Sequence, residues 1–426
     1  LLLLLNASVP TYLYSYSWEK VTNISPRDGA WISNYWLDIY FLPANDSFGW
    51  ICGRHGKVLR TTDGGLSWRG VQIPGADHLE SVHFVNAFVG YTSGPAGIFK
   101  STNGGASWTD ITPPAHADLS NLWGNYFLNA DYGLVIGGGC NLSYQHFWLT
   151  TDGGQTWTET TYNIPGSGLT DLILYDDGNG YCVSSGNLWQ TLDSGRTWSV
   201  YSNTGSNIWH EEITHLGPTF VLPYSGDNCT GQGASGGIRY THSSGLTWHN
   251  YETGENMFGI FCEDASKIWA AGWNESIYYS SDGGATWVNK NCGIDPGNLD
   301  DIWFKSPNQG WVVGQDIYRF SNDRVDVSRD SIFFGNNCYP GEYYDTVYVE
   351  NISFNAANFV ISLEGRHPFE FELLIPETDL LMTACEMLEI PIRFNPNTVG
   401  LKEATIKILQ NGNPYYVKLV GKTYES

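Results

Sequence analysis

The chain has 426 residues, of which 42% are hydrophobic and 15% charged, and its formal net charge is −23. This length and apolar content allow more than one packed core, which excludes an intrinsically disordered protein. Nucleic acid is excluded as a partner because phosphate binding needs basic surface, and only 21 Lys and Arg stand against 44 Asp and Glu.

Residues 1–16 begin with LLLLLNASVP, a short apolar stretch followed by small residues. Such a start is typical of the end of a signal peptide, and it is too short to span a bilayer. Two interpretations stay open: a remnant of processing, or an extended strand that adds to the sheet edge of a neighbour. The eight cysteines include no Cys-x-x-Cys pair, which favours disulfides over a zinc site. We therefore expect a secreted or cell-surface protein without a transmembrane segment.

One box of eight residues recurs six times, as TTDGGLSW, STNGGASW, TTDGGQTW, TLDSGRTW, THSSGLTW and SSDGGATW. The spacing of roughly 40 to 50 residues is that of a four-stranded propeller blade. We expect a structural role for the box, because its Asp or Asn can accept hydrogen bonds from its own turn and its Gly can adopt positive φ. The tryptophan would then pack between blades. The expected structural residues are Asp63, Trp68, Asn103, Trp108, Asp152, Trp157, Asp193, Trp198, Trp248, Asp282 and Trp287.

A seventh unit, at residues 299–323, shows three strands but no box. The stretch SWEKVTNI from Ser17 is similar to the strands that follow the boxes, so we expect Trp18 to sit in the missing fourth strand. Closing the ring in this way leaves few free sheet edges. The sequence therefore predicts an all-β fold with a seven-bladed β-propeller over residues 17–324.

The boxes with their preceding Gly-Trp strands resemble the Asp-box repeats of the photosystem II assembly and stability factor family, over residues 17 to about 324. The resemblance implies a seven-bladed propeller whose boxes are structural, and a basic, Arg-rich binding face. This chain is acidic and has few arginines, so we expect a different partner and no photosynthetic role.

The boxes end before residue 325, and VYVENISFNAANFVISLEG and IPIRFNPNTVGLKEATIKI follow. These stretches resemble the Hydin-like and sperm-protein-like immunoglobulin folds, which implies an immunoglobulin-like β-sandwich at residues 325–426 that serves as spacer or attachment. Cys338 and Cys385 are the two cysteines of this region, and we expect them to form a disulfide. Cys140 and Cys229 lie in two long insertions and form a second candidate pair.

Two patterns in the sequence raise the question of a functional site, and the first of them does not fit one. His210 and His215 in HEEITH are five apart in an expected strand, which does not fit the four-residue helical spacing of a zinc protease. Aligning the innermost strands instead places one residue per blade, four of them carboxylates, at one mouth of the channel. These are Asp38, Ser81, Asn121, Asp171, Glu212, Gly259 and Asp301. Either they cap strand starts, or the carboxylates bind a cation or a basic side chain.

The aromatic residues expected near that rim are Trp31, Tyr35, Trp36, Trp123 and Trp209. From the pattern we expect a non-catalytic protein that binds a protein partner, or its own subunits, in an extracellular assembly. Asp38, Asp171, Glu212, Asp301, Trp36 and Trp209 are the expected binding residues, and no cofactor is expected beyond a cation at the carboxylates. The alternative is a carbohydrate-active protein, either a lectin or a glycosidase, that uses the same rim to bind a glycan.

Overall fold

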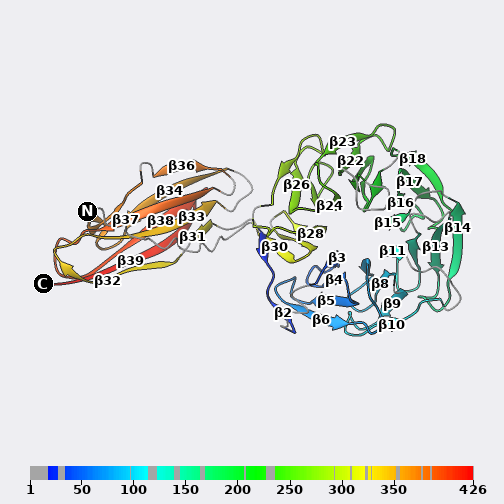
Figure 1. Cartoon of the computed structure of the whole chain (residues 1–426), viewed down its shortest axis with the longest axis horizontal. Helices are drawn as coiled ribbons and strands as arrows, with labels where there is room; N and C mark the ends of the chain where they lie inside the picture. Colours follow the sequence, from blue (N-terminus) through cyan, green and yellow to red (C-terminus); the bar gives the residue numbers. More distant parts are fainter. Residues whose placement is uncertain are drawn as a thin grey trace, which may run out of the picture. The chain divides into compact units, whose positions relative to one another are not determined.

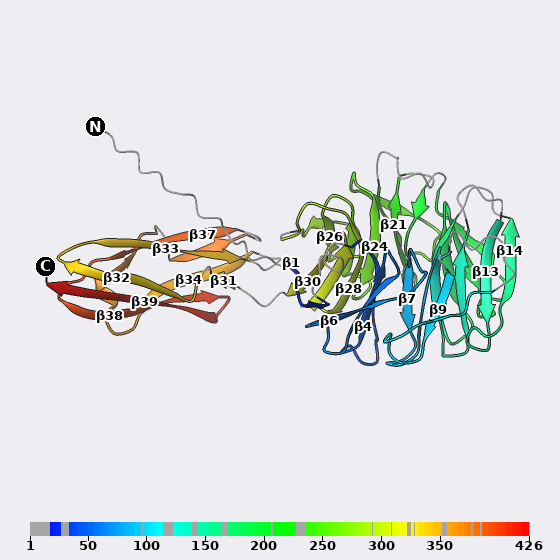
Figure 2. The ribbon, with the colours of Figure 1, turned by 60° about the horizontal axis from the view of Figure 1, so that its bottom comes forward.

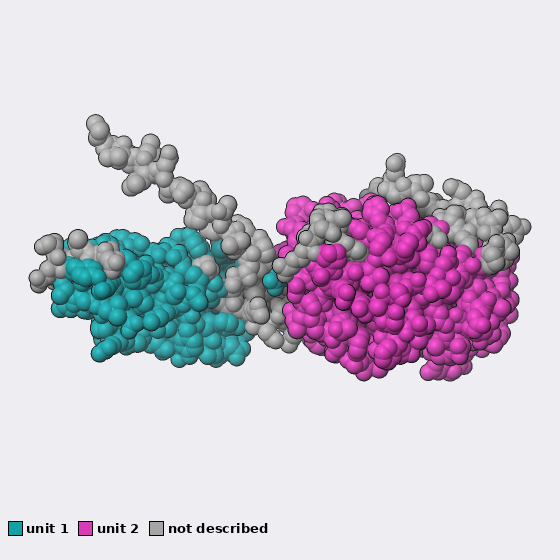
Figure 3. All heavy atoms as spheres, turned by 90° about the horizontal axis from the view of Figure 1, so that it is seen from below, with its two compact units in different colours: residues 1–19, 321–426 teal, residues 20–320 magenta. Residues whose placement is uncertain are grey.

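The structure is a computed structural model that divides into two compact units, residues 20–320 and residues 1–19 with 321–426 (Figure 3). The described residues are 18–26, 34–95, 97–113, 122–138, 144–163, 168–205, 208–226, 236–291, 293–307, 309–321, 325–327, 329–351, 356–375, 378–383 and 386–425. Apart from one 3-10 helix, η1 (Pro368–Glu370), every regular element in these ranges is a β-strand. The described residues contain no helix long and apolar enough to cross a membrane.

In the described residues, the propeller comprises seven sheets that surround a centre (Figure 1). Blade one contains β2 (Ile24–Ser25), β3 (Trp36–Phe41), β4 (Gly49–Gly53), β5 (Lys57–Thr61) and β6 (Trp68–Gln72). Blade two contains β7 (Ser81–Phe84), β8 (Gly90–Gly94), β9 (Gly97–Ser101) and β10 (Thr109–Asp110). Blade three contains β11 (Leu122–Phe127), β12 (Gly133–Gly137), β13 (Tyr144–Thr150) and β14 (Thr158–Asn163). Blade four contains β15 (Leu169–Leu174), β16 (Gly180–Ser184), β17 (Asn187–Thr191) and β18 (Ser199–Asn203). Blade five contains β19 (Trp209–His210), β20 (Thr214–Leu216), β21 (Thr219–Ser225), β22 (Gly237–Thr241) and β23 (His249–Glu252). Blade six contains β24 (Met257–Cys262), β25 (Ile268–Gly272), β26 (Ser276–Ser280) and β27 (Val288–Asn289). Blade seven contains β28 (Leu299–Ser306), β29 (Gln309–Gly314), β30 (Ile317–Ser321) and β1 (Trp18–Lys20).

The seventh blade takes its fourth strand from the other end of the propeller sequence. Strand β1 lies beside β30 in the sheet order β1-β30-β29-β28. The backbone N–H of Val21 donates to the carbonyl of Ile317 over 2.8 Å, and Lys20 forms an ion pair with Asp316. Trp18 is fully buried. The pairing expected from the stretch that follows Ser17 is therefore present.

The hydrophobic clusters of the propeller lie between neighbouring blades. One cluster joins Leu134 and Phe147 of blade three to Leu172 and Trp198 of blade four. The box tryptophans of the other blades belong to, or pack against, corresponding clusters. Packing between blades thus replaces a single central core, which leaves the middle of the ring free for polar residues.

Each Asp box is a closed hydrogen-bonded turn. In the first box Asp63 Oδ1 accepts the backbone N–H of Ser67 at 3.0 Å, and its Oδ2 accepts the Ser67 hydroxyl at 2.6 Å. The hydroxyl oxygen of Thr61 accepts the N–H of Gly65, whose φ of 81° favours glycine. Asp152, Asp193 and Asp282 repeat these contacts, and Asn103 and Ser243 supply the oxygen in the remaining two boxes.

The C-terminal unit has two sheets that enclose one hydrophobic core (Figure 2). The first sheet contains β31 (Val325–Val327), β33 (Tyr343–Asn351), β37 (Met387–Phe394) and β35 (Phe371–Leu373). The second contains β32 (Ser331–Tyr339), β39 (Asn413–Glu425), β38 (Gly400–Gln410), β34 (Ala357–Glu364) and β36 (Asp379–Met382). Val347 and Ile392 of the first sheet share the core with Phe359 and Ile406 of the second. Alternating burial along β38 follows from the two-residue period of a strand that covers a core on one face.

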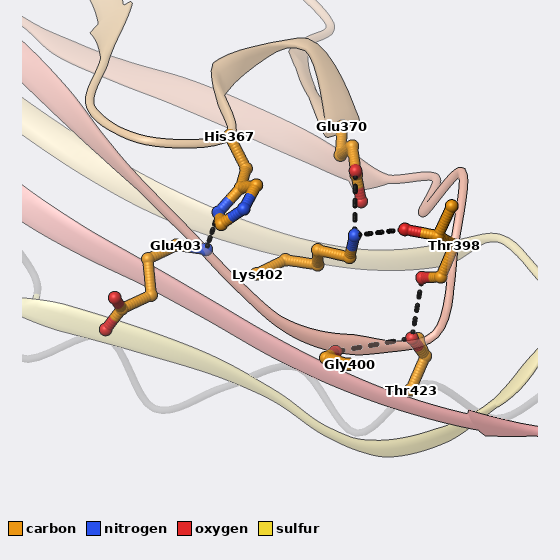
Figure 4. A network of polar contacts seen from close by, with 7 residues as sticks. All are labelled: His367, Glu370, Thr398, Gly400, Lys402, Glu403 and Thr423. Atoms are coloured by element: carbon orange, nitrogen blue, oxygen red, sulfur yellow. Dashed lines mark hydrogen bonds and ion pairs between the residues drawn. The ribbon is translucent and has the colours of Figure 1, made fainter.

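Figure 4 shows a buried ion pair that fixes η1 to β38. Lys402 Nζ lies 3.0 Å from Glu370 Oε1 and donates to the Thr398 hydroxyl at 2.6 Å. Only 7% of the Lys402 side chain and 11% of the Glu370 side chain are exposed. Neither charge can gain full hydration if its partner is removed.

Several cysteine predictions fall outside the described part of the chain. Cys140, Cys229 and Cys385 are not described, nor is the side chain of Cys338 in β32, so both proposed pairings stay predictions. Cys52, Cys182 and Cys262 are free thiols. Residues 1–16 also lie outside the described residues, so the strand-donor interpretation stays open.

The first testable prediction concerns closure of the ring. Deleting residues 1–22 removes β1 and exposes the edge of β30, so we expect a lower melting temperature and a less cooperative transition. Loss of Trp18 alone should cost about 3–5 kcal/mol, the usual value for truncating a buried aromatic side chain. Differential scanning calorimetry measures this, with deletion of residues 1–16 as the control that retains β1. An unchanged transition after the longer deletion would contradict closure by this strand.

The second prediction concerns the Lys402–Glu370 pair. Lys402→Ala leaves a buried carboxylate without its cation and should destabilise the C-terminal unit by about 3–5 kcal/mol. The double change Lys402→Met with Glu370→Leu should recover most of this loss, because neither charge then stays buried. All tryptophans precede residue 325, so the circular-dichroism transition should shift while the tryptophan fluorescence transition does not. Equal stability of the single and double variants would refute the role of the unpaired charge.

Candidate functional site

A cavity of about 1030 Å³ occupies the centre of the propeller, and all seven blades contribute to its wall. Its wall is acidic. Seven carboxyl groups line it, those of Asp38, Glu80, Asp171, Glu211, Glu212, Asp300 and Asp301. Among the described lining residues, Arg54 is the one Lys or Arg side chain. Seven carboxyl groups thus share the described wall of the cavity with one Lys or Arg side chain.

Several of the innermost strands carry a β-bulge that positions these acids. The register of β3 with β4 shifts between Trp36 and Asp38, and that of β28 with β29 shifts between Leu299 and Asp301. A bulge leaves one residue of the ladder unpaired and turns nearby side chains. Asp300 and Asp301, which are consecutive, consequently both line the cavity.

Four carboxylates form contacts that run from one blade to the next. We define the acidic collar as Asp38, Asp171, Glu212 and Asp301. Backbone N–H groups of the following blade donate to these side chains: Val82 to Asp38 at 2.6 Å, Ile213 to Asp171 at 3.0 Å, Ile260 to Glu212 at 2.8 Å and Ile39 to Asp301 at 2.8 Å. The collar thus satisfies backbone donors that would otherwise be unpaired in the interior. The two interpretations of these residues, as caps of strand starts or as a site for a cation or basic side chain, stay predictions.

Two glycines occupy the equivalent positions in blades three and six. The register shifts between Leu122 and Gly124 in β11, and between Met257 and Gly259 in β24. A Cβ on Gly124 would lie 2.7 Å from the carbonyl oxygen of Thr170, so a side chain cannot fit there without moving the backbone. The predicted ring therefore needs a correction in blade three: Asn121 is not a described residue, and Gly124 holds the bulge position.

Asp301 contacts two other members of the acidic collar. The carboxyl groups of Asp38 and Glu212 each form a side-chain hydrogen bond with Asp301. Burial, together with the repulsion of Asp301, raises the pKa of Asp38 and of Glu212 well above the usual range. Burial also raises the pKa of Asp171 to about 7, against the lowering effect of the N–H donors of Ile213 and Leu172. Touching carboxyl groups cannot all ionise without a cation, so the collar by itself retains protons.

A second carboxyl set consists of Glu80, Glu211 and Asp300, each one residue before a collar or aligned position. Burial raises the pKa of Glu80 to about 7 and that of Glu211 to about 8. For Asp300, burial and the charges of Glu80 and Glu211 raise the pKa well above its usual range. Tyr35 donates its hydroxyl to Asp300 at 3.4 Å. These three acids were not identified from the sequence, although each directly precedes an aligned residue.

Aromatic rings lie two residues after the aligned positions on the same strands. We define the aromatic collar as Tyr40, His83, Tyr126, Phe261 and Trp303, all of which line the cavity. Its ring centroids are separated by 4.8 Å between Tyr40 and His83, 4.5 Å between His83 and Tyr126, and 5.4 Å between Tyr40 and Trp303. Burial lowers the pKa of His83 to about 3, so this imidazole is neutral. The two-residue period of a strand places the acidic and aromatic collars on the same wall.

The aromatic residues proposed for the rim have different positions. Trp36 is 1% exposed and belongs to the cluster between blades one and seven, so it is not available for binding, contrary to our expectation. Trp209 lines the cavity, with its ring 6.0 Å from that of Trp123. Tyr35 also lines the cavity, whereas Trp31 falls outside the described residues.

The histidines of HEEITH make separate contacts. His210 is fully buried and shares a hydrogen bond with the Thr204 hydroxyl at 2.8 Å, and His215 contacts the Tyr175 hydroxyl at 2.7 Å. In the part of the chain that is described, no group of three His, Cys, Asp or Glu side chains has a geometry that could hold a metal ion. The suggestion of a cation at the collar stays a prediction.

Comparison with known proteins identifies the family of this chain. The model of the family described as "Photosynthesis system II assembly factor YCF48" matches residues 29–320. The chain belongs to this family.

Two curated relatives and one solved structure illustrate the match. The "Photosystem II assembly protein Ycf48" of Synechococcus sp. (strain JA-2-3B'a(2-13)) is 28% identical over 296 residues, which cover 66% of this chain and 84% of the relative. The "Photosystem II stability/assembly factor HCF136, chloroplastic" of Oryza sativa subsp. japonica is 23% identical over 346 residues, covering 70% of this chain and 80% of the relative. The solved structure of "YCF48 bound to D1 peptide" has a TM-score of 0.54 at 22% identity and covers 74% of this chain and all of that chain. At that identity the structural likeness shows the fold.

These findings overturn the predicted setting of the protein. Its family and named relatives are photosystem II assembly proteins, one of them chloroplastic, so the predicted secreted or cell-surface location and extracellular assembly are wrong. The expectation of no photosynthetic role, which relied on the acidic composition, disagrees with the same matches. The expected kind of partner, a protein, agrees with the D1 peptide to which the solved relative is bound. The carbohydrate-active alternative has no better support, since likeness to a Xanthomonas campestris xyloglucanase is at 13% identity and shows fold alone.

The carboxyl groups of the cavity predict how stability depends on pH. We expect the free energy of unfolding to fall as pH rises from about 6.5 to about 8. Asp171, Glu80 and Glu211 have pKa values of about 7, 7 and 8 in the folded protein, whereas unfolded carboxyl groups ionise near pH ~4. The folded state then holds protons that the unfolded state has lost, so linkage lowers stability as pH rises toward the folded values, and stability levels off once pH exceeds them. Buried His83 and His210, whose pKa values burial lowers to about 3, have the opposite effect, but only below the unfolded histidine pKa of about 6.5.

Urea unfolding followed by tryptophan fluorescence at several pH values measures this slope. Glu211→Gln should make it shallower, while the exposed control Glu19→Gln should leave it unchanged. A stability that rises or stays constant over this pH range would show that these acids are already ionised in the folded protein.

Proposed function

We propose that this protein is an assembly factor whose propeller holds a segment of a client polypeptide in its central cavity. The observation that carries this proposal is the cavity of about 1030 Å³, to which every blade contributes charged, polar or aromatic side chains. That volume is at the upper end for ligand-binding cavities, and it suits a few side chains rather than a folded domain. A relative with the same fold is described as bound to a peptide, which supports the same mode of binding here.

The relatives name the first client to test. They are photosystem II assembly proteins, and the solved relative is bound to a D1 peptide. We therefore propose a segment of D1, or of a protein that takes its place in another complex, as the client.

We also propose that the protein works without catalysing a reaction, as its family of assembly factors suggests. Each acidic-collar carboxylate already accepts a backbone N–H of the neighbouring blade, which reduces its freedom to act as a general acid or base. For the C-terminal unit, which the family match does not reach, we propose an immunoglobulin-like class because two sheets of strands enclose one core.

Site-specific photocrosslinking in the cells that make this protein tests client binding. The photoreactive amino acid p-benzoylphenylalanine would replace Phe258, which lines the cavity, or Val288 on outer strand β27, which is 55% exposed. We expect irradiation to join position 258, but not 288, to one segment of one client, identified by mass spectrometry. Equal labelling from both positions, or no adduct at 258, would refute client binding in the cavity.

A further inference from the structure

We infer that the cavity recognises one lysine or arginine side chain of the client, with the cation among Asp38, Glu212 and Asp301 and the methylene stem against the aromatic collar. This inference rests on the proposed client binding and adds the chemistry of the recognised residue. It concerns the inner wall of the ring and not the outer surface of the blades.

The charge of the collar favours a cationic ligand. Asp38 and Glu212 each hydrogen-bond to Asp301 at the cavity wall. Among the described residues, no lysine or arginine forms an ion pair with any of the three. A buried group of carboxyls is stable either protonated or paired with a cation, and a bound ammonium or guanidinium group supplies that cation. Its arrival should release protons from the collar.

The collar carboxyl groups are also oriented in advance. The amide of Val82 holds Oδ2 of Asp38, and the amide of Ile260 holds Oε2 of Glu212. The blade-to-blade contacts therefore fix the direction of both carboxyl groups. Acceptors fixed in advance lose little entropy on binding, which favours affinity.

Asn125, which lines the same cavity and is 4% exposed, points to a ligand that donates hydrogen bonds. Its Nδ2 donates to the Ser81 carbonyl and the Ser93 hydroxyl, both at 3.0 Å. Its Oδ1 has no hydrogen-bond partner among the described residues. A buried acceptor without a donor is costly, so a ligand that supplies the donor gains affinity. Lysine and arginine side chains carry several donors and no acceptor.

The aromatic collar favours an organic cation over a metal ion. Tyr40 and Trp303, two residues after Asp38 and Asp301, have ring centroids 5.4 Å apart. Such rings attract an ammonium or guanidinium group and pack against its methylene stem. The described side chains offer no three-ligand metal geometry, and an anionic segment would be repelled by the carboxyls.

The test uses the full chain and acetylated, amidated heptapeptide libraries that differ in one fixed central residue. That residue is lysine, arginine, norleucine, glutamine or glutamate. We expect the lysine and arginine libraries to bind at least tenfold more tightly than the norleucine library, which keeps the stem and lacks the charge. Titration calorimetry of the best lysine peptide in phosphate and in Tris at neutral pH should show proton release. Equal binding of norleucine and lysine libraries, or no measurable binding of either, overturns the inference.

Matched variants separate recognition from folding. Asp38→Asn and Asp171→Asn alter the same kind of blade-to-blade contact, but Asp171 has no side-chain hydrogen bond with the other collar acids. We expect Asp38→Asn to lose the preference for lysine and Asp171→Asn to keep it, at similar melting temperatures. Trp303→Leu, which touches no collar hydrogen bond, should weaken lysine binding while Tm stays within a few degrees. If both Asn variants lose the preference equally, the three-carboxyl group is not the site.

Failure of this inference can be told apart from failure of the proposed function. If position 258 crosslinks to a client while norleucine and lysine peptides bind equally, the client is held in the cavity by other contacts and only the inference falls. If position 258 gives no adduct, the proposed function falls as well.

Discussion

The hydrogen bond from a backbone amide of one blade to a carboxylate of the preceding blade is the contact on which the centre of this protein depends. It occurs at Asp301 with Ile39, Asp38 with Val82, and in two further pairs of neighbouring blades. Several of the inner strands have a bulge or irregularity near this point, and a carboxylate is a strong acceptor for a donor outside the ladder. The ring is therefore joined at its centre by acids, and the cavity is acidic because of how the blades are joined.

The same contact has an energetic cost, because it holds carboxyl groups close together in the interior of the propeller. Acids that join the blades also line one cavity, and burial raises their pKa values. In the interior, hydrophobic clusters between blades compensate for this cost by packing large side chains such as Trp68 and Trp198. A cationic ligand would relieve the repulsion, so one arrangement of residues accounts both for cohesion of the ring and for a preference among client side chains.

The elements that repeat could be predicted from the sequence, whereas those that break the repeat could not. The boxes indicated the blades, and the stretch after Ser17 indicated the closing strand, because both patterns are local and periodic. The position of Gly124 could not be predicted, since a bulge shifts the register by one residue without changing the apolar pattern. Trp36 looked available for binding, yet its neighbours in blade seven, such as Trp311, bury it, and they are far away in the sequence. The acidic composition was taken as a sign against a photosynthetic role, whereas several of the acidic side chains line the cavity.

A crystal structure of the full chain with a lysine-containing client peptide would decide whether the acidic collar both joins the blades and selects the client. The lysine ammonium nitrogen should lie at hydrogen-bond distance, about 2.7–2.9 Å, from carboxylate oxygens of Asp38 or Glu212, with the lysine stem beside Tyr40 and Trp303. A peptide that lies on the outer face of the blades, or that enters the cavity with its lysine directed away from the acidic collar, would contradict this role.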